Sequence, residues 1–107
     1  MVRSSEQVEP RPATGGTDDP RTAELRRAVS RLRRRLAAHP VDFPDRATGE
    51  DELAALAAMT GHGTPEAARL RRSLLLVAGS IGSVSALAPE MAELRAAVEL
   101  FGAPRRR

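Results

Sequence analysis

The most informative segment of this 107-residue chain is residues 64–89, which read TPEAARLRRSLLLVAGSIGSVSALAP. Its large apolar residues recur at alternating spacings of four and three, which places them on one face of an α-helix. These residues are Leu70, Leu74, Val77, Ile81 and Val84. Thr64 and Pro65 are typical of a helix start, and Pro89 cannot continue a helix. The segment therefore predicts a helix over residues 65–87.

A second line of residues follows the opposite face of this predicted helix, and most of its members are small. The line consists of Leu75, Gly79, Gly82 and Ala86. The chain also carries no charge between Arg72 and Glu90. A helix that is apolar on two faces is normally covered on two sides, so it is either the central helix of one chain's bundle or packs its small-residue face against a second chain. A membrane contact is disfavoured, because a membrane span needs about 20 apolar residues.

Two further helices follow from the same kind of pattern. Asp19 is a suitable N-cap and Pro20 a suitable first residue for a helix over residues 20–39, which a proline ends. Its apolar stripe is Leu25, Val29, Leu32 and Leu36. A helix over residues 89–101 has the stripe Met91, Leu94, Val98 and Phe101. It is either separate from the helix before it or continuous with that helix through a kink at Pro89.

The remaining helix has two alternative starts. Thr48 and Asp51 resemble a capping box, and acidic residues favour a helix N-terminus. With Asp45 as the cap instead, Gly49 would lie inside the helix. The thin apolar stripe of this helix is Leu53, Leu56, Ala57 and Thr60.

These helices predict an all-α fold, a small bundle of three to four helices over residues 20–102. In the connector after the first helix, Val41 and Phe43 are expected to fold back onto the core. Residues 1–19 are expected to be a disordered tail, because their few apolar residues cannot offset the entropy lost on ordering. Residues 103–107 form a short basic tail. The N-terminus has no apolar core for a signal peptide, so we expect a cytoplasmic protein.

The composition excludes several classes of site. The chain has no cysteine, so it forms neither a disulfide nor a thiolate zinc site. It has no tryptophan or tyrosine and only two phenylalanines, which leaves few aromatic platforms for single-stranded nucleic acid. The two histidines, His39 and His62, do not stand at metal-ligand spacing. We therefore expect a protein that is not an enzyme and that has no cofactor and no metal.

The net charge of +3 hides a strong local imbalance. Residues 20–39 carry a net charge of +6, and residues 40–60 carry a net charge of −4. The candidates for a basic surface are Arg26, Arg27, Arg31, Arg33, Arg34 and Arg35. On a helical wheel they spread over about 200° instead of forming one stripe. A solvated face, with or without pairing to the acidic segment, is therefore favoured over a contact with nucleic acid or an acidic membrane surface.

A resemblance to a known family rests on two segments, DELAALAAMTG (51–61) and LRRSLLLVAGSIGSVSALAPEMAELRAAVELFG (70–102). They resemble an uncharacterised family of short, all-helical actinobacterial proteins of the streptomycete type, whose function is unknown. The likeness covers about residues 19–102. It implies a small cytosolic helical protein, and it implies no activity, ligand or functional residue.

We expect a non-catalytic interaction or regulatory module that forms a homodimer, or binds a helical protein partner, through the predicted helix over residues 65–87. The alternative is a nucleic-acid-associated accessory protein that uses the Arg-rich helix over residues 20–39. Salt separates the two. Apolar self-association tolerates moderate salt, whereas binding to phosphates weakens steeply as the salt concentration rises.

Overall fold

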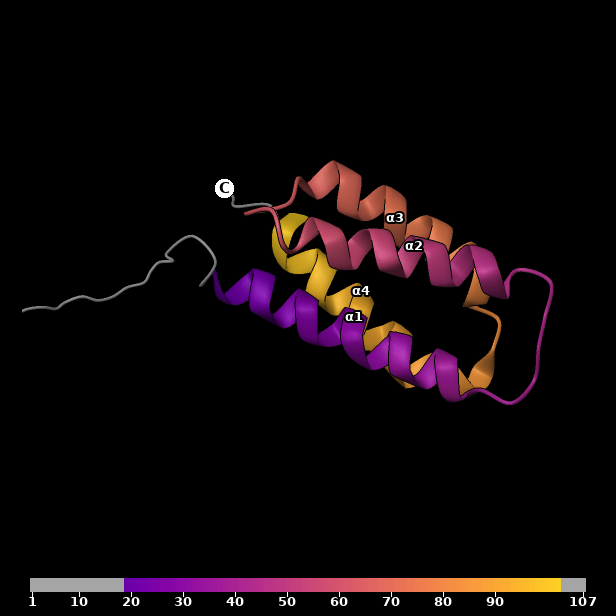
Figure 1. The fold of residues 1–107 in the computed structure, drawn as a ribbon. Coiled ribbons are helices and arrows are strands. Elements are labelled where there is room, and N and C mark those ends of the chain that lie inside the picture. Colours follow the sequence, from indigo (N-terminus) through magenta and orange to yellow (C-terminus); the bar gives the residue numbers. More distant parts are fainter. Residues whose placement is uncertain (1–18, 103–107) are drawn as a thin grey trace, which may run out of the picture.

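The computed structural model describes residues 19–102, which form four α-helices that run up and down in antiparallel order (Figure 1). The helices are α1 (Pro20–Ala38), α2 (Arg46–Met59), α3 (Ala67–Ile81) and α4 (Ala88–Gly102), and a short 3₁₀ helix, η3 (Ser85–Leu87), leads into α4. α1 packs mainly against α4, and α2 packs mainly against α3, so the bundle has two layers of two helices. The described residues contain no strand, and the all-α prediction is confirmed. The predicted tails, residues 1–19 and 103–107, lie outside the described part of the chain except for Asp19, which is the N-cap of α1.

The core consists of the apolar stripes that the sequence predicts. Its large buried side chains are Leu25, Val29, Leu32 and Leu36 of α1, Leu53 and Leu56 of α2, Leu70, Val77 and Ile81 of α3, and Met91, Leu94 and Val98 of α4. Leu74 and Phe101 are partly buried against this cluster. Each fully buried side chain of this size stabilises the fold by about 1.5–3 kcal/mol relative to exposure, so the inward stripes hold the four helices together.

α1 begins at the N-cap that the sequence predicts. The Asp19 carboxylate accepts hydrogen bonds from the backbone N–H and from the guanidinium of Arg21, both at 2.9 Å, and Pro20 lies in the first turn. The side-chain hydrogen bond from Arg21, followed by the backbone hydrogen bond, lowers the pKa of the Asp19 carboxyl. The helix ends at Ala38, with His39 as its C-cap.

α2 starts at the earlier of the two predicted positions. Its N-cap is Asp45 and Gly49 lies inside the helix, so the alternative with Thr48 as the cap is wrong. Gly49 is buried against α3. A Cβ placed on it would lie 2.5 Å from Cγ2 of Ile81 and 3.0 Å from Oγ of Ser80. The two helices approach this closely only because Gly49 has no side chain.

The helix predicted over residues 65–87 is wrong at both ends. Glu66 is the N-cap of α3, so the helix begins two residues later than predicted. At the other end Gly82 is the C-cap, and its N–H donates to the carbonyl of Ala78 at 2.9 Å. Val84 then has an extended backbone and precedes η3. The chain therefore leaves the helix at Ile81, six residues before the predicted end at residue 87.

The early end of α3 has a packing reason. A continuous helix would place Leu87 about 240° around the axis from Ile81, which is away from the core. The turn and η3 redirect the chain, and Leu87 is 1% exposed beneath α4. α4 is therefore a separate helix and not the continuation of α3 through a kink at Pro89.

Only one of the two apolar residues in the α1–α2 connector covers the core. Phe43 is partly buried against the core, and its ring meets the His39 ring edge-on with the centroids 6.0 Å apart. Val41 is 61% exposed, so the prediction that it folds back is wrong. Its backbone is held by a hydrogen bond from Arg46 to its carbonyl at 3.1 Å, and not by burial of the side chain.

Arg46, the first residue of α2, closes the C-terminal end of α1. Its Nη2 donates to the Leu36 carbonyl at 2.6 Å, and its Nη1 donates to the His39 carbonyl at 2.9 Å. The last carbonyls of a helix have no partner within the helix and carry partial negative charge, which a guanidinium neutralises. The Arg46 side chain is 17% exposed, and its Nε lies 3.4 Å from the Glu50 carboxylate.

Two other arginines make the same kind of contact. Arg26 of α1 donates to the carbonyl of Thr60, just after α2, at 3.1 Å. Arg71 of α3 donates to the carbonyl of Gly102, at the end of α4, at 3.0 Å. The C-terminal ends of α1, α2 and α4 are thus each bound by a guanidinium from another helix.

Replacing Arg46 with alanine is expected to destabilise the bundle, because the α1 carbonyls lose their donors. Hydrogen bonds to a charged group contribute about 1.5–3 kcal/mol each, so the free energy of unfolding should fall by at least about 2 kcal/mol. Arg33→Ala is the matched control on α1, because Arg33 forms no ion pair within residues 19–102. Its free energy of unfolding should change by no more than about 0.5 kcal/mol. Urea unfolding gives both values, and equal losses would contradict the capping role.

Two helical glycines are expected to respond to the same substitution in opposite directions. Gly49→Ala forces a methyl group into Ile81 and should cost about 1–3 kcal/mol of stability. Gly79→Ala adds a methyl group where nothing lies within 4 Å, and should gain about 0.5–1 kcal/mol because alanine favours the helix. Melting temperatures measured by circular dichroism test the pair. A shift of both in one direction would refute the close approach of α2 to α3.

Asp19→Ala is expected to lower the melting temperature at neutral pH, because α1 loses its N-cap. The pKa of Asp19 is lower in the folded protein than the usual 3.8 of an unfolded chain. The stabilisation is therefore present above pH 3.8 and is lost as the pH falls through the folded-state pKa. Melting curves of both proteins at several pH values should show the difference closing in acid. A difference that does not depend on pH would argue against the charged cap.

Candidate functional site

The four residues predicted to form a contact face do not share one helix. Leu75 and Gly79 lie one turn apart on α3, and both are exposed. Gly82 is the C-cap and Ala86 belongs to η3, because α3 ends before them. The Ala86 carbonyl accepts a hydrogen bond from Arg35 of α1 at 3.3 Å. The predicted face is thus corrected to its first two residues.

The outward face of α3 exposes large apolar side chains next to an open surface. Leu75 is 72% exposed, and Leu76 is 48% exposed. A Cβ placed on Gly79 would meet nothing within 4 Å. At Gly82, in contrast, a Cβ would collide with the Ala78 carbonyl oxygen, so the backbone of its own chain disfavours a side chain there. We call Leu75, Leu76 and Gly79 the α3 outer face.

A groove of about 480 Å³ lies beside this face, between α3 and α4. It is lined by Arg71, Leu74 and Leu75 of α3 and by Arg95, Val98, Glu99 and Gly102 of α4. The leucines and the valine are apolar, whereas the other long side chains bring two guanidiniums and one carboxylate. Arg71 is held by the carbonyl of Gly102. Arg95 and Glu99 are exposed and form no ion pair within the described part of the chain.

Three of the predicted basic residues of α1 are bound to other elements of the fold. The Nη1 atom of Arg31 lies 2.7 Å from Oε2 of Glu93, and the Nε atom of Arg35 lies 3.7 Å from Oε2 of Glu90. Both carboxylates belong to α4. Arg26 binds the end of α2, as described above. The main acidic partner of α1 is therefore α4, and not the acidic segment that follows α1 in the sequence.

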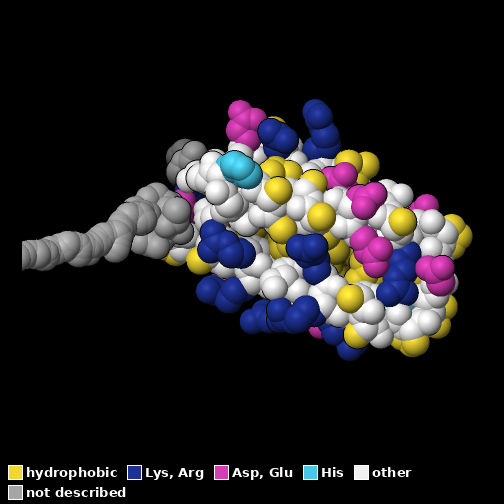
Figure 2. All heavy atoms as spheres, in the orientation of Figure 1, with side chains coloured by type: hydrophobic (Ala, Val, Ile, Leu, Met, Phe, Trp, Pro, Cys, Tyr) yellow, Lys and Arg dark blue, Asp and Glu magenta, His cyan; other side chains and the backbone are white. Residues whose placement is uncertain are grey.

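The other three predicted basic residues stay on the surface of α1. Arg27 pairs with Glu24, and Arg34 donates to the Ser30 hydroxyl at 2.9 Å. Arg33 has no ion pair within residues 19–102. Figure 2 shows arginine side chains gathered along the edge that α1 occupies and acidic side chains over α2. Opposite charges thus lie side by side on this view of the molecule, which weakens any continuous basic field.

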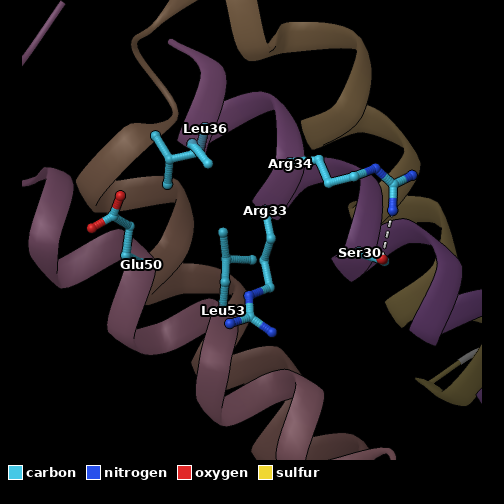
Figure 3. A pocket seen from close by; sticks show the side chains of 7 residues that line it. Ser30, Arg33, Arg34, Leu36, Glu50 and Leu53 are labelled. Carbon is cyan, nitrogen blue, oxygen red and sulfur yellow. Dashed lines mark hydrogen bonds between the residues drawn. The ribbon is translucent and has the colours of Figure 1, made fainter. Parts of the chain in front are cut away.

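Arg33 borders an open groove of about 410 Å³ between α1 and α2 (Figure 3). Its side chain extends alongside Leu53, whereas Arg34 turns back to its own helix and the Glu50 carboxylate points away from Arg33. Leu36 and Leu53, which lie beneath the groove, are at most 1% exposed. The groove therefore offers little apolar surface to a partner.

The two histidines lie at opposite ends of α2. His39 lies in the connector before α2, and His62 follows the end of α2, where its Nδ1 is 2.6 Å from the Ala58 carbonyl oxygen. A helix of 14 residues is about 21 Å long, so the two rings cannot act on one substrate atom. Residues 19–102 hold no group of three His, Asp or Glu side chains arranged for a metal ion. Across the same residues, no helix has both the length and the hydropathy that crossing a membrane requires.

Two features of the structure are not predicted from the sequence. The α4 side of the groove was missed, although Arg95 stands four residues before Glu99, and this order is the weaker one for a pair within a helix. That order is the available signal in the sequence that the two side chains pair poorly with each other and are free to bind other groups. The role of Arg46 had no such signal, because it depends on the path of the α1–α2 connector in space.

Comparison with known proteins gives one match. The model of the DUF5955 family, described as a family of unknown function, matches residues 14–102. No curated protein and no solved structure matches the chain. The expectation of a family without a known function is confirmed, and the matched range includes all four helices and both sides of the α3–α4 groove.

Proposed function

The chain belongs to the DUF5955 family, whose function is unknown, and we propose that it is a non-catalytic helical module that self-associates through the α3 outer face. The observation that carries the proposal is the exposure of Leu75 and Leu76, which are 72% and 48% accessible on one helix. Apolar area gains about 25 cal/mol per Å² when it leaves water, so covering these side chains favours association. The open surface at Gly79 lets another chain come close.

The size of the bundle supports the same proposal. A domain of fewer than about 100 residues buries a modest fraction of its surface and commonly gains stability by association. After Arg72, α3 carries no charged residue. A partner surface that covers it therefore has no charged group to remove from water there.

Nucleic-acid binding is the weaker alternative. A binding surface for phosphates needs cationic side chains that are available to exchange their counterions. In the described bundle, Arg31 and Arg35 pair with α4, Arg27 pairs within α1, and Arg26 donates to α2. Most of the charge that suggested this function is therefore directed to other parts of the same chain.

The test is the molar mass of the full chain in solution, measured by light scattering over a concentration series at two salt concentrations. Refractive index gives the concentration, because the chain has no tryptophan or tyrosine. We expect a dimer that persists at the higher salt concentration. Leu75→Glu places a charge on the contact face and should raise the dissociation constant of the dimer at least about 30-fold, since a buried leucine contributes about 2 kcal/mol.

Leu100→Glu is the matched control. Leu100 is 46% exposed, close to the value of Leu76, but it lies on α4 and lines a separate groove between α1 and α4. This variant should keep the wild-type molar mass. A monomeric wild-type chain at every concentration, or equal losses in the two variants, would contradict self-association through α3. A dimer that dissociates on modest addition of salt would favour an electrostatic contact instead.

A further inference from the structure

We infer that the partner of the α3 outer face is a second copy of this chain, docked in a two-fold arrangement on the α3–α4 groove, with Arg95 of each copy paired to Glu99 of the other. The inference rests on the proposed function and adds the geometry and the residues that select the partner. It differs from the contact expected from the sequence, because the groove and not the residues after α3 receives the second chain.

The groove supplies both a projecting side chain and a space to receive it. Leu75 projects from α3 with 72% of its surface exposed and stands at the edge of a groove of about 480 Å³. Leu74 and Val98 line the same groove. In a two-fold contact each surface element meets its counterpart on the other copy. Val98 is only 2% exposed, so the apolar area that this contact covers comes from Leu75 and the partly exposed Leu74 of both copies.

The charges at the groove are self-complementary. Arg95 and Glu99 line it one turn apart on α4, and neither forms an ion pair within the described residues. Their order along the helix, with arginine first, is the weaker one for pairing with each other. Arg71, the other guanidinium of the groove, is engaged with the carbonyl of Gly102. One positive and one negative group therefore remain to meet a partner.

The register of α3 and α4 places Leu75 between these two charges along the groove. The two helices are antiparallel (Figure 1), and Arg71 meets Gly102 at one end of the groove. Four residues onward from Arg71 is Leu75, and four residues back from Gly102 is Val98, so these two lie at about the same level. Arg95 and Glu99 lie on the two sides of that level.

A two-fold axis near Leu75 therefore exchanges the two charged positions. It brings Arg95 of one copy to Glu99 of the other, and the reverse pair forms at the same time. Both pairs flank the apolar contact, which is the usual arrangement of a polar rim around an apolar centre. A different protein would need this same pattern of opposite charges around a leucine, whereas a second copy has it by symmetry.

The test uses charge reversals in the full chain. Arg95→Glu gives each copy two carboxylates at the rim, and Glu99→Arg gives each copy two guanidiniums. Each variant alone should dimerise about tenfold or more weakly than the wild type, because both interchain pairs become repulsive. An equimolar mixture of the two variants should recover the wild-type molar mass, since every carboxylate then meets a guanidinium. The double variant R95E/E99R should also recover it.

The controls remove two simpler explanations. Each reversal changes the net charge of +3 by two, so both single variants stay positive and no overall attraction drives them together. Arg69→Glu is a reversal at an exposed position of α3 outside the groove, and it should leave the dimer unchanged. Circular dichroism spectra of all variants report whether the helices are intact.

The outcomes separate this inference from the proposed function. A wild-type dimer whose single variants do not recombine in the mixture would overturn the two-fold geometry and leave self-association standing. A wild-type chain that is monomeric throughout would overturn both. A dimer that is weakened equally by Arg69→Glu and Arg95→Glu would show a dependence on general charge, and this also overturns the inference.

Discussion

The apolar stripes hold the four helices together, and a contact between a guanidinium and the end of a helix sets how α1 and α2 are joined. The side chain of Arg46 reaches from the first turn of α2 to the last carbonyls of α1, which have no donors within their own helix. The contact fixes the path of the connector between the two helices. Arg26 returns the contact from α1 to the end of α2. The two helices are thus fastened at both ends by groups that the hydrophobic core does not supply.

The contacts of the guanidiniums also determine which surface remains open to a partner. Three arginines bind the C-terminal ends of other helices, and two arginines of α1 pair with carboxylates of α4. These contacts occupy much of the positive charge within the chain itself. α3 takes part through Arg71 near its start, and its later turns carry no charge. Those turns expose leucines instead. A chain that looks basic in sequence therefore offers its most exposed leucines on the later turns of α3, away from the arginines of α1.

Most of the helices follow from the sequence because their physical causes are local. The stripes of α1 and α4 repeat with the helical period and are buried as predicted, and Asp19 with Pro20 sets the start of α1. The end of α3 does not follow, because Val84 continues the apolar spacing although it stands outside the helix. It is partly buried against the core by another route, through the turn that also buries Leu87. Periodicity alone does not distinguish these two ways of reaching a core.

The candidate site is predictable only in part, for a related reason. Leu75 and Gly79 lie on one helix face, so helical spacing finds them. Gly82 fits the same spacing, but it is the C-cap of α3 and packs against the Ala78 backbone, so helical spacing does not place it on that face. The groove depends on the register between α3 and α4, and no local sequence pattern predicts how two helices are aligned. Gly49 shows the same limit, since its need for glycine comes from Ile81 of another helix.

The central claim is that the contact surface of this protein lies on α3 and α4 and not on the arginines of α1. The most direct measurement is a set of ¹H–¹⁵N correlation spectra of the full chain over a dilution series. We expect the amide shifts of residues 71–79 and 95–102 to change with concentration, while those of residues 26–35 stay constant. Shifts that are constant throughout, or that change only along α1, would contradict the claim.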